Sequence, residues 1–250
     1  MSSGSETLAG RNSVREALLA RRRVIHQVVL AEGVGEKGIV EEIVQLAREA
    51  RVPVEHARRQ DLDRWGIELK TQGVIARVSG YPYAEVDDLL AVAHERGEPP
   101  FLLALDSLQD PQNVGSLLRT AEVVGVHGVI LPERRAVGVT PAVSRASAGA
   151  VEWLRVAMVT NLARTLDALK EAGIWVVGVE DLPEAKDYRR VDLNMPVALV
   201  VGSEGRGTRR LVTEKCDLLV RIPMRGHINS LNVSVAGSLV LYQAWNARNQ

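Results

Sequence analysis

From residue 101 onward, short uninterrupted runs of apolar residues alternate with stretches in which apolar residues recur every three or four positions. Uninterrupted runs are typical of strands covered on both faces of a parallel sheet, and the longer period is typical of amphipathic helices. The pattern predicts strands at 101–105, 128–131, 174–179, 197–201 and 218–222, a shorter strand near 153–156, and helices at 114–124, 161–172, 208–212 and 233–248. Strands that alternate with helices predict an α/β domain built on a parallel sheet.

The first 80 residues carry a separate and smaller α/β pattern. It predicts helical segments within 5–22 and at 38–51 and 61–65, and strands at 25–30, 52–55 and 73–78. Between the two patterns, residues 81–100 carry one basic and five acidic residues, a shift that is typical of a linker, here with a short helix at 86–95. We therefore expect a small α/β domain at 1–79, an acidic linker at 80–99 and the parallel-sheet domain at 100–250.

Composition narrows the class of protein. The net charge is zero, with 31 basic and 31 acidic residues, which argues against a protein that coats nucleic acid through bulk electrostatics. No apolar run approaches the roughly 20 residues of a membrane span, and the N-terminus lacks the pattern of a secretory signal. The lone Cys216 is expected to be a buried or half-buried thiol in a reducing cytosol, and the five histidines have no metal-ligand spacing. These observations predict a cytoplasmic protein with no membrane partner and no metal.

Polar segments follow three of the predicted strands: two contain glycine, at 106–121 and 202–207, and the third consists of 222–224 followed by 229–234. The carboxyl ends of parallel strands are where an open α/β sheet binds its ligand, so these segments form the candidate site. Arg119 lies four residues after Gly115 and is therefore expected on the same helix face.

Each segment also has a purely structural interpretation. Arg119 could be a surface arginine, 202–207 could be a plain turn, and helix caps could lie at Asn113, Ser230, Asn232 or Ser234. In the last predicted helix, the small residues at 236–238 would let another helix or a partner chain approach closely.

Taken together, the three segments resemble the motifs of the SpoU (TrmH-type) family of SPOUT RNA 2′-O-ribose methyltransferases, across 105–242. Residues 8–18 and 72–78 resemble the small RNA-binding domain of that family, so the resemblance covers the whole chain. It is greatest to the bacterial members that methylate a guanosine of 23S rRNA. The chain departs from that pattern at Thr71 and at 226–228, which bears on the identity of the substrate.

The resemblance implies a deep C-terminal trefoil knot, a homodimer through the knotted domain, 23S rRNA as substrate and S-adenosylmethionine as the cofactor, without a metal. By carry-over, the cofactor is expected at Gly202, Gly205, Ile222, Pro223, Met224 and Leu231. The methyl-transfer site is expected to contain Asn113, Arg119, Glu204, Ser230 and Asn232.

The resemblance leaves the role of Arg119 open. The family is usually described with this arginine as the general base. The guanidinium of a free arginine has a pKa above about 12, which favours a charged clamp on an RNA phosphate instead. Glu204 is expected to orient Asn232 or Arg119. In the first domain, the candidate phosphate contacts are Arg11, Arg21, Arg22, Arg23 and Arg58, which could equally be solvated helix ends.

Three alternatives remain at this point. The chain could be a tRNA 2′-O-methyltransferase of the same family. It could be a different α/β enzyme that binds a nucleotide phosphate at 202–207, or a non-catalytic RNA-binding protein on the same scaffold.

Overall fold

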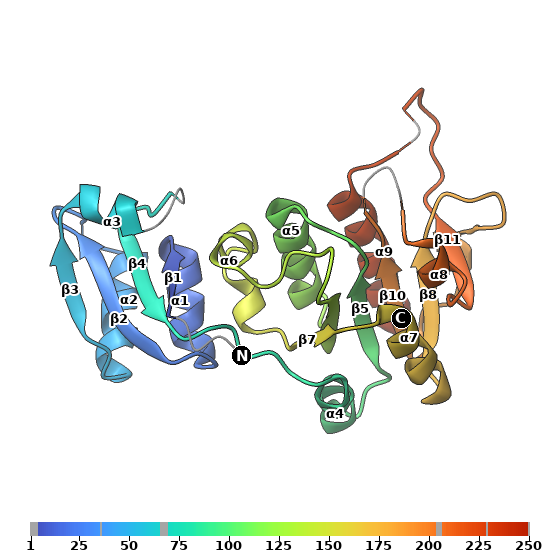
Figure 1. Ribbon diagram of the computed structural model, residues 1–250, viewed down its shortest axis with the longest axis horizontal. Coiled ribbons are helices and arrows are strands. Elements are labelled where there is room, and N and C mark those ends of the chain that lie inside the picture. Colours follow the sequence, from blue (N-terminus) through green and yellow to red (C-terminus); the bar gives the residue numbers. More distant parts are fainter. Residues whose placement is uncertain (1–4, 36, 66–69, 204–206, 229, 250) are drawn as a thin grey trace. The chain divides into compact units, whose positions relative to one another are not determined.

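The structure is a computed structural model that describes residues 5–35, 37–65, 70–203, 207–228 and 230–249. The chain folds into two compact units, which are described separately here (Figure 1). The first comprises Met1–Pro82 with Val139–Trp153, and the second comprises Tyr83–Gly138 with Leu154–Gln250. Among the described residues, no helix has both the length and the apolar character needed to cross a membrane.

The first unit contains a four-stranded mixed sheet in the order β1-β4-β2-β3. Its strands are β1 (Glu6–Ala9), β2 (Ile25–Ala31), β3 (Val54–Ala57) and β4 (Val74–Val78), and its helical segments are α1 (Arg11–Ala20), α2 (Ile39–Glu49), α3 (Arg59–Trp65), α6 (Pro141–Ala146) and the 3-10 turn η1 (Ala150–Glu152). Apolar side chains of α1 and α2 pack on one face of the sheet, and Leu62 of α3 packs on the other. The predicted helical segment within 5–22 is divided in the structure, because Gly10 turns the chain with a φ of 98° between β1 and α1.

The second unit is built on a seven-stranded sheet in the order β7-β6-β5-β10-β8-β11-β9, in which every pairing is parallel. Its strands are β5 (Phe101–Leu105), β6 (Gly128–Pro132), β7 (Val156–Val159), β8 (Trp175–Val179), β9 (Lys186–Asp187), β10 (Val197–Val201) and β11 (Leu218–Arg221). Its helical segments are α4 (Val86–Arg96), α5 (Pro111–Val123), α7 (Leu162–Glu171), η2 (Tyr188–Arg190), α8 (Arg210–Thr213) and α9 (Val233–Arg248). The predicted parallel-sheet α/β domain, preceded by a small α/β domain, is confirmed, and the predicted knot is consistent with this architecture.

The strand order places β5 and β10 side by side at the centre of this sheet. From β5 the chain continues outward through β6 and β7, whereas β8 and β11 lie on the far side of β10. Such a reversal is the topological switch point at which open α/β sheets bind ligands beyond the carboxyl ends of their strands. The polar segments that follow β5 and β10 therefore meet at this place.

The compact units divide the chain differently from the predicted domains at two places. Helix α4, within the predicted linker, is closed at its start by a capping box of Glu85 and Asp88 and packs Leu89 into the core of the second unit. Gly128 of β6 allows this contact, because a Cβ there would lie 2.5 Å from a Leu89 methyl group. The second difference is Val139–Trp153, which belongs to the first unit. The predicted bounds of independent domains stay a prediction.

Helix α9 packs closely on α5 and β10 of the same chain. A Cβ on Gly237 would lie 2.5 Å from a Leu117 methyl group and 3.3 Å from Val201, and the hydroxyls of Ser238 and Thr120 are 2.8 Å apart. The close neighbour expected for the small residues of this helix is therefore another helix of the chain.

Arg248 anchors the C-terminal end of α9 to the segments that precede β5 and β10, at the amino ends of these two strands. Its guanidinium donates to the carbonyls of Pro99 at 2.8 Å, Pro100 at 3.1 Å and Met195, and it stacks over the Phe101 ring at 4.6 Å. Burial lowers the pKa of this guanidinium from its ordinary value. These contacts fix the helix that carries Asn232 at its other end.

Candidate active site

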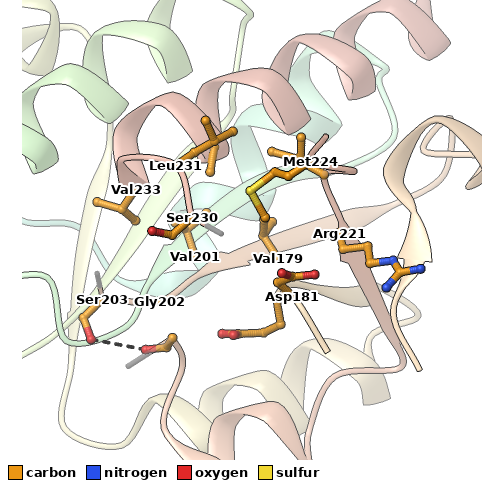
Figure 2. A pocket seen from close by; sticks show the side chains of 14 residues that line it. Val179, Asp181, Val201, Gly202, Ser203, Arg221, Met224, Ser230, Leu231 and Val233 are labelled. Atoms are coloured by element: carbon orange, nitrogen blue, oxygen red, sulfur yellow. Dashed lines mark hydrogen bonds between the residues drawn. The ribbon is translucent and has the colours of Figure 1, made fainter. Parts of the chain in front are cut away.

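A cavity of about 320 Å³ opens at the carboxyl ends of β8, β10 and β11. It is lined by Val179, Glu180, Asp181, Val201, Gly202, Ser203, Gly207, Arg221, Ile222, Met224, Ser230, Leu231, Val233 and Ala236. Figure 2 shows side chains from the ends of β8 and β10 and from the segment between β11 and α9 converging on this space. Its walls combine aliphatic and thioether side chains with carboxylates, which suits a ligand with both an apolar ring and polar groups.

Most of the residues expected to bind the cofactor lie on this first cavity. Gly202, Ile222, Met224 and Leu231 line it, together with Ser230 from the expected methyl-transfer group. Pro223 is exposed and does not line the cavity. Gly205 and Glu204 lie outside the described residues.

The residues at the end of β8 were not predicted to belong to the site. Val179, Glu180 and Asp181 all line the first cavity. The available signal was the pair of acidic residues directly after a predicted parallel strand, at the same edge of the sheet as the other two segments.

Gly202 is required by the packing of two backbone segments. A Cβ there would lie 2.1 Å from the carbonyl carbon of Gly207 and the nitrogen of Thr208. Ser203 and Gly207 exchange two backbone hydrogen bonds of 2.9 Å, and both residues line the cavity together with Gly202. The interpretation of 202–207 as a plain turn stays a prediction, because 204–206 lie outside the described residues.

A second cavity, of about 640 Å³, adjoins the first and shares Ser203, Gly207 and Val233 with it. Its other lining residues are polar or charged in the main: Ser107, Leu108, Gln109, Asp110, Asn113, Arg135, Thr208, Arg209 and Arg210. The two adjoining cavities thus differ in chemistry: the first has carboxylates and apolar groups, and the second has arginines.

Asn113 and Asn232 are joined by a hydrogen bond although 119 residues separate them. The amide nitrogen of Asn232 donates to the amide oxygen of Asn113 at 2.9 Å. The oxygen of Asn232 caps α9 by accepting from the backbone N–H groups of Ser234 and Val235. The cap of α5 is Asp110, not Asn113, because the helix begins at Pro111, and this leaves the Asn113 side chain to line the second cavity.

Arg119 lines neither cavity of the single chain. It is exposed on α5, four residues after the buried Gly115, and in the α-helix this spacing keeps the two residues on neighbouring positions of one face. Arg119 is six residues, or about 240° of helix rotation, from Asn113. The fold therefore brings Asn113, Ser230 and Asn232 together and directs Arg119 elsewhere.

One buried and one half-buried carboxylate hold the backbone at Thr208 and Arg209. The Asp106 carboxylate is fully buried and accepts from the backbone N–H of Arg209 at 2.7 Å and from its guanidinium at 2.8 Å. Glu180 accepts from the backbone N–H of Thr208. Asp106 belonged to the first polar segment, but its partner lies 103 residues away and could not be read from spacing.

No group of three or more His, Cys, Asp or Glu side chains in the described part of the chain could hold a metal ion. Cys216 is half-buried, as predicted, and burial raises the pKa of its thiol to about 12, so it remains protonated at neutral pH.

The family model described as the SpoU rRNA Methylase family matches residues 100–242, which is more than half of the chain. The chain belongs to the SpoU family. A second model, described as RNA 2′-O ribose methyltransferase substrate binding, matches residues 7–84. The expectation of a SpoU-type RNA methyltransferase with an N-terminal substrate-binding domain is therefore confirmed.

Similar proteins extend over nearly the full length of the chain. YacO of Bacillus subtilis is named as a putative TrmH family tRNA/rRNA methyltransferase. It is 47% identical to this chain, and the alignment covers 100% of this chain and 98% of YacO. The crystal structure of the SpoU methyltransferase AviRb from Streptomyces viridochromogenes is 26% identical, with a TM-score of 0.81 over 98% of this chain and 90% of that one. An AdoMet-bound rRNA methyltransferase from Sinorhizobium meliloti is 25% identical, with a TM-score of 0.76 over 96% of this chain and 86% of that one.

In the substrate-binding domain, the five arginines expected to contact RNA differ in exposure. Arg21 and Arg58 are exposed, Arg11 donates to the Gln72 carbonyl at 3.2 Å, and Arg22 donates to the Tyr81 hydroxyl at 3.1 Å. The expectation that Arg23 contacts RNA is contradicted by the structure. Its side chain is fully buried and pairs with Glu6 at 2.6 Å and Glu152 at 2.8 Å, so it has a structural role and cannot contact RNA in this structure.

Proposed function

We propose that this SpoU-family chain transfers the methyl group of S-adenosylmethionine to a ribose 2′-hydroxyl in RNA, and that its target is a guanosine of 23S rRNA. The observation that carries the proposal is the Asn113–Asn232 pair beside two adjoining cavities. The first cavity holds four residues expected to bind the cofactor, and the second is lined by arginines that suit a polyanion.

The first cavity fits S-adenosylmethionine in size and chemistry. Its volume of about 320 Å³ lies in the range of small-molecule sites. Met224, Leu231 and Val201 offer the apolar surface that an adenine ring needs, and the Asp181 carboxylate can accept hydrogen bonds from ribose hydroxyls. The cofactor supplies an electrophilic methyl group on a sulfonium.

The residues of the chain contribute placement above all. Holding two reactants in line can lower the barrier by roughly 7–11 kcal/mol. Asn232 is fixed by its cap on α9 and in turn fixes the amide of Asn113, so both groups are positioned to orient the ribose. We assign Ser230, on the first cavity, to the same group and Glu204 to orienting Asn232 or Arg119.

We infer that Arg119 acts across a homodimer. It is exposed on α5, and α9 carries the exposed apolar side chains Val235, Leu239 and Tyr242, which recur at the helical spacing of one face. Burying this face against a second copy would bring Arg119 of one subunit near its partner, where it would clamp an RNA phosphate. Exposed apolar stripes of this kind mark interaction surfaces.

The choice of 23S rRNA rests on the resemblance of the N-terminal domain, which residues 7–84 match as a substrate-binding module. The alternative is a tRNA substrate, since YacO and its relatives are named for both RNAs. Mapping ribose methylation in rRNA and tRNA from cells with and without this gene separates the two. Loss of one 2′-O-methylguanosine from 23S rRNA supports the proposal, and loss from tRNA alone overturns the choice of substrate.

A further inference from the structure

The individual arginines of the second cavity have not yet been given a role. Arg135, after β6, and Arg209, before α8, both line it, on the same cavity as Asn113. Arg135 is exposed and has no ion pair or side-chain hydrogen bond within the described part of the chain. The cavity therefore presents two guanidinium groups beside one of the asparagines of the proposed methyl-transfer site.

Two of the six described non-glycine residues with positive φ lie on this cavity. Ser107 and Arg135 line it with φ values of 63° and 64°, a left-handed conformation that non-glycine residues seldom adopt. The loops that carry them are held side by side by a 2.9 Å hydrogen bond from the Val137 N–H to the Leu108 carbonyl. Residues kept in such conformations cluster at ligand sites, because the surrounding structure must maintain them against strain.

The orientation of Arg209 is set by Asp106. Two nitrogens of the guanidinium and the backbone N–H of Arg209 contact the buried carboxylate at 2.7 to 2.8 Å, and Ser107 donates to the same carboxylate at 3.2 Å. A guanidinium has five N–H donors, and 40% of the Arg209 side chain remains exposed beside the cavity. Asp106 thus fixes an arginine that still has donors for a ligand.

We propose that Arg135 and Arg209 bind the phosphates that flank the nucleotide to be methylated, and that Asp106 is a positioning residue which holds Arg209 for this task. Paired guanidinium groups match phosphate oxygens in both charge and geometry. The inference rests on the proposed function and names the part of the site that binds the RNA backbone.

A purely structural role would give a different result. If Asp106 and Arg209 only held the backbone in place, their loss would lower thermal stability and weaken S-adenosylmethionine binding, because Gly207, two residues before Arg209, lines the first cavity. The dependence of RNA binding on salt would not change. If Arg209 binds a phosphate, loss of Asp106 or Arg209 makes RNA binding less dependent on salt. Each phosphate contact on a single strand contributes about 0.7 to the slope of log affinity against log salt.

The experiment uses the full-length protein, unmodified 23S rRNA transcript and unmodified tRNA. Arg135→Ala is expected to raise the KM for RNA about tenfold and to reduce the salt slope by about 0.7, with S-adenosylmethionine affinity within about twofold of wild type. Arg134→Ala, an exposed neighbour outside the cavity lining, is the matched control and is expected to change none of these. Arg135 lies in an exposed loop, so its variant tests the proposal even where a buried variant unfolds.

The role of Asp106 is tested by a double variant. Asp106→Asn and Arg209→Ala are each expected to raise the KM, and the double variant is expected to be no worse than Arg209→Ala alone. Unchanged KM and salt slope in both arginine variants would overturn the phosphate site, and additive effects would overturn the positioning role. A wild-type protein that binds RNA with the expected salt slope but methylates neither RNA would instead refute the proposed function.

Discussion

Asn232 has two tasks that a substitution can separate. Its side-chain oxygen caps α9 through the N–H groups of Ser234 and Val235, and its side-chain nitrogen bridges to Asn113 at 2.9 Å. Asn232→Ala removes both. Asn232→Ser keeps a good capping residue but cannot reach Asn113 in the same way.

The magnitudes follow from these contacts. Loss of the cap costs about 1 kcal/mol of unfolding free energy. Loss of the bridge costs only about 0.5 kcal/mol, because Asn232 is exposed and water can replace the bond. The alanine variant should therefore be about 1 kcal/mol less stable than the serine variant, which corresponds to about 2–4 °C in Tm for a chain of this size. Both variants should lose about 100-fold or more in kcat, since misplacement of a reacting group has effects of that order.

The assay combines thermal unfolding, S-adenosylmethionine binding and single-turnover methylation of RNA. Asn161 provides the matched control, because it caps α7 through the N–H of Arg164 and lines neither cavity. Asn161→Ala should lose about 1 kcal/mol of stability and keep its activity. Wild-type turnover by the serine variant would refute the positioning role, as would an equal loss of activity in the Asn161 variant.

Further predictions concern stability and assembly. Arg248→Met should cost about 2 kcal/mol, measured by denaturant unfolding, because three backbone carbonyls lose a charged donor; an unchanged midpoint would contradict the anchoring role. The Nδ1 of His127 accepts a hydrogen bond from the Phe101 N–H, and burial lowers the pKa of this imidazole. The native state therefore binds fewer protons than the unfolded state, and its stability should fall as the pH drops below about 6.5. His127→Asn should flatten this dependence, and an unchanged pH slope would exclude His127 as its source. Leu239→Glu should convert a dimer to a monomer in light scattering, and an unaltered mass would rule out the α9 face.

The sequence predicted the elements whose pattern is strong. Strands β5, β8 and β10 are uninterrupted apolar runs, which are typical of strands covered on both faces of a parallel sheet. The family resemblance named four of the residues that line the first cavity, and the parallel strands bring them together, because their carboxyl ends share one edge of the sheet. The edge strands β1 and β9 were missed, because four and two residues carry too little pattern.

The partners of several polar side chains could not be predicted, because these contacts join distant parts of the chain. The burial of Arg23 is set by Glu152, 129 residues away, so three consecutive arginines looked alike in sequence. The same holds for Asp106 and Arg209, which are 103 residues apart. The choice of Asp110 over Asn113 as the cap of α5 is instead local, because the helix begins at Pro111. Single-sequence periodicity reports which face of an element is apolar, but it does not report which partner a polar side chain finds.

The methyl transfer is tested most directly by incubating the purified protein with methyl-labelled S-adenosylmethionine and unmodified 23S rRNA, and then digesting the RNA to nucleosides. The proposed function predicts label in 2′-O-methylguanosine at one position, and its loss in the Asn232→Ser variant. Label confined to base-methylated nucleosides, or none in any RNA while the cofactor binds, would contradict it.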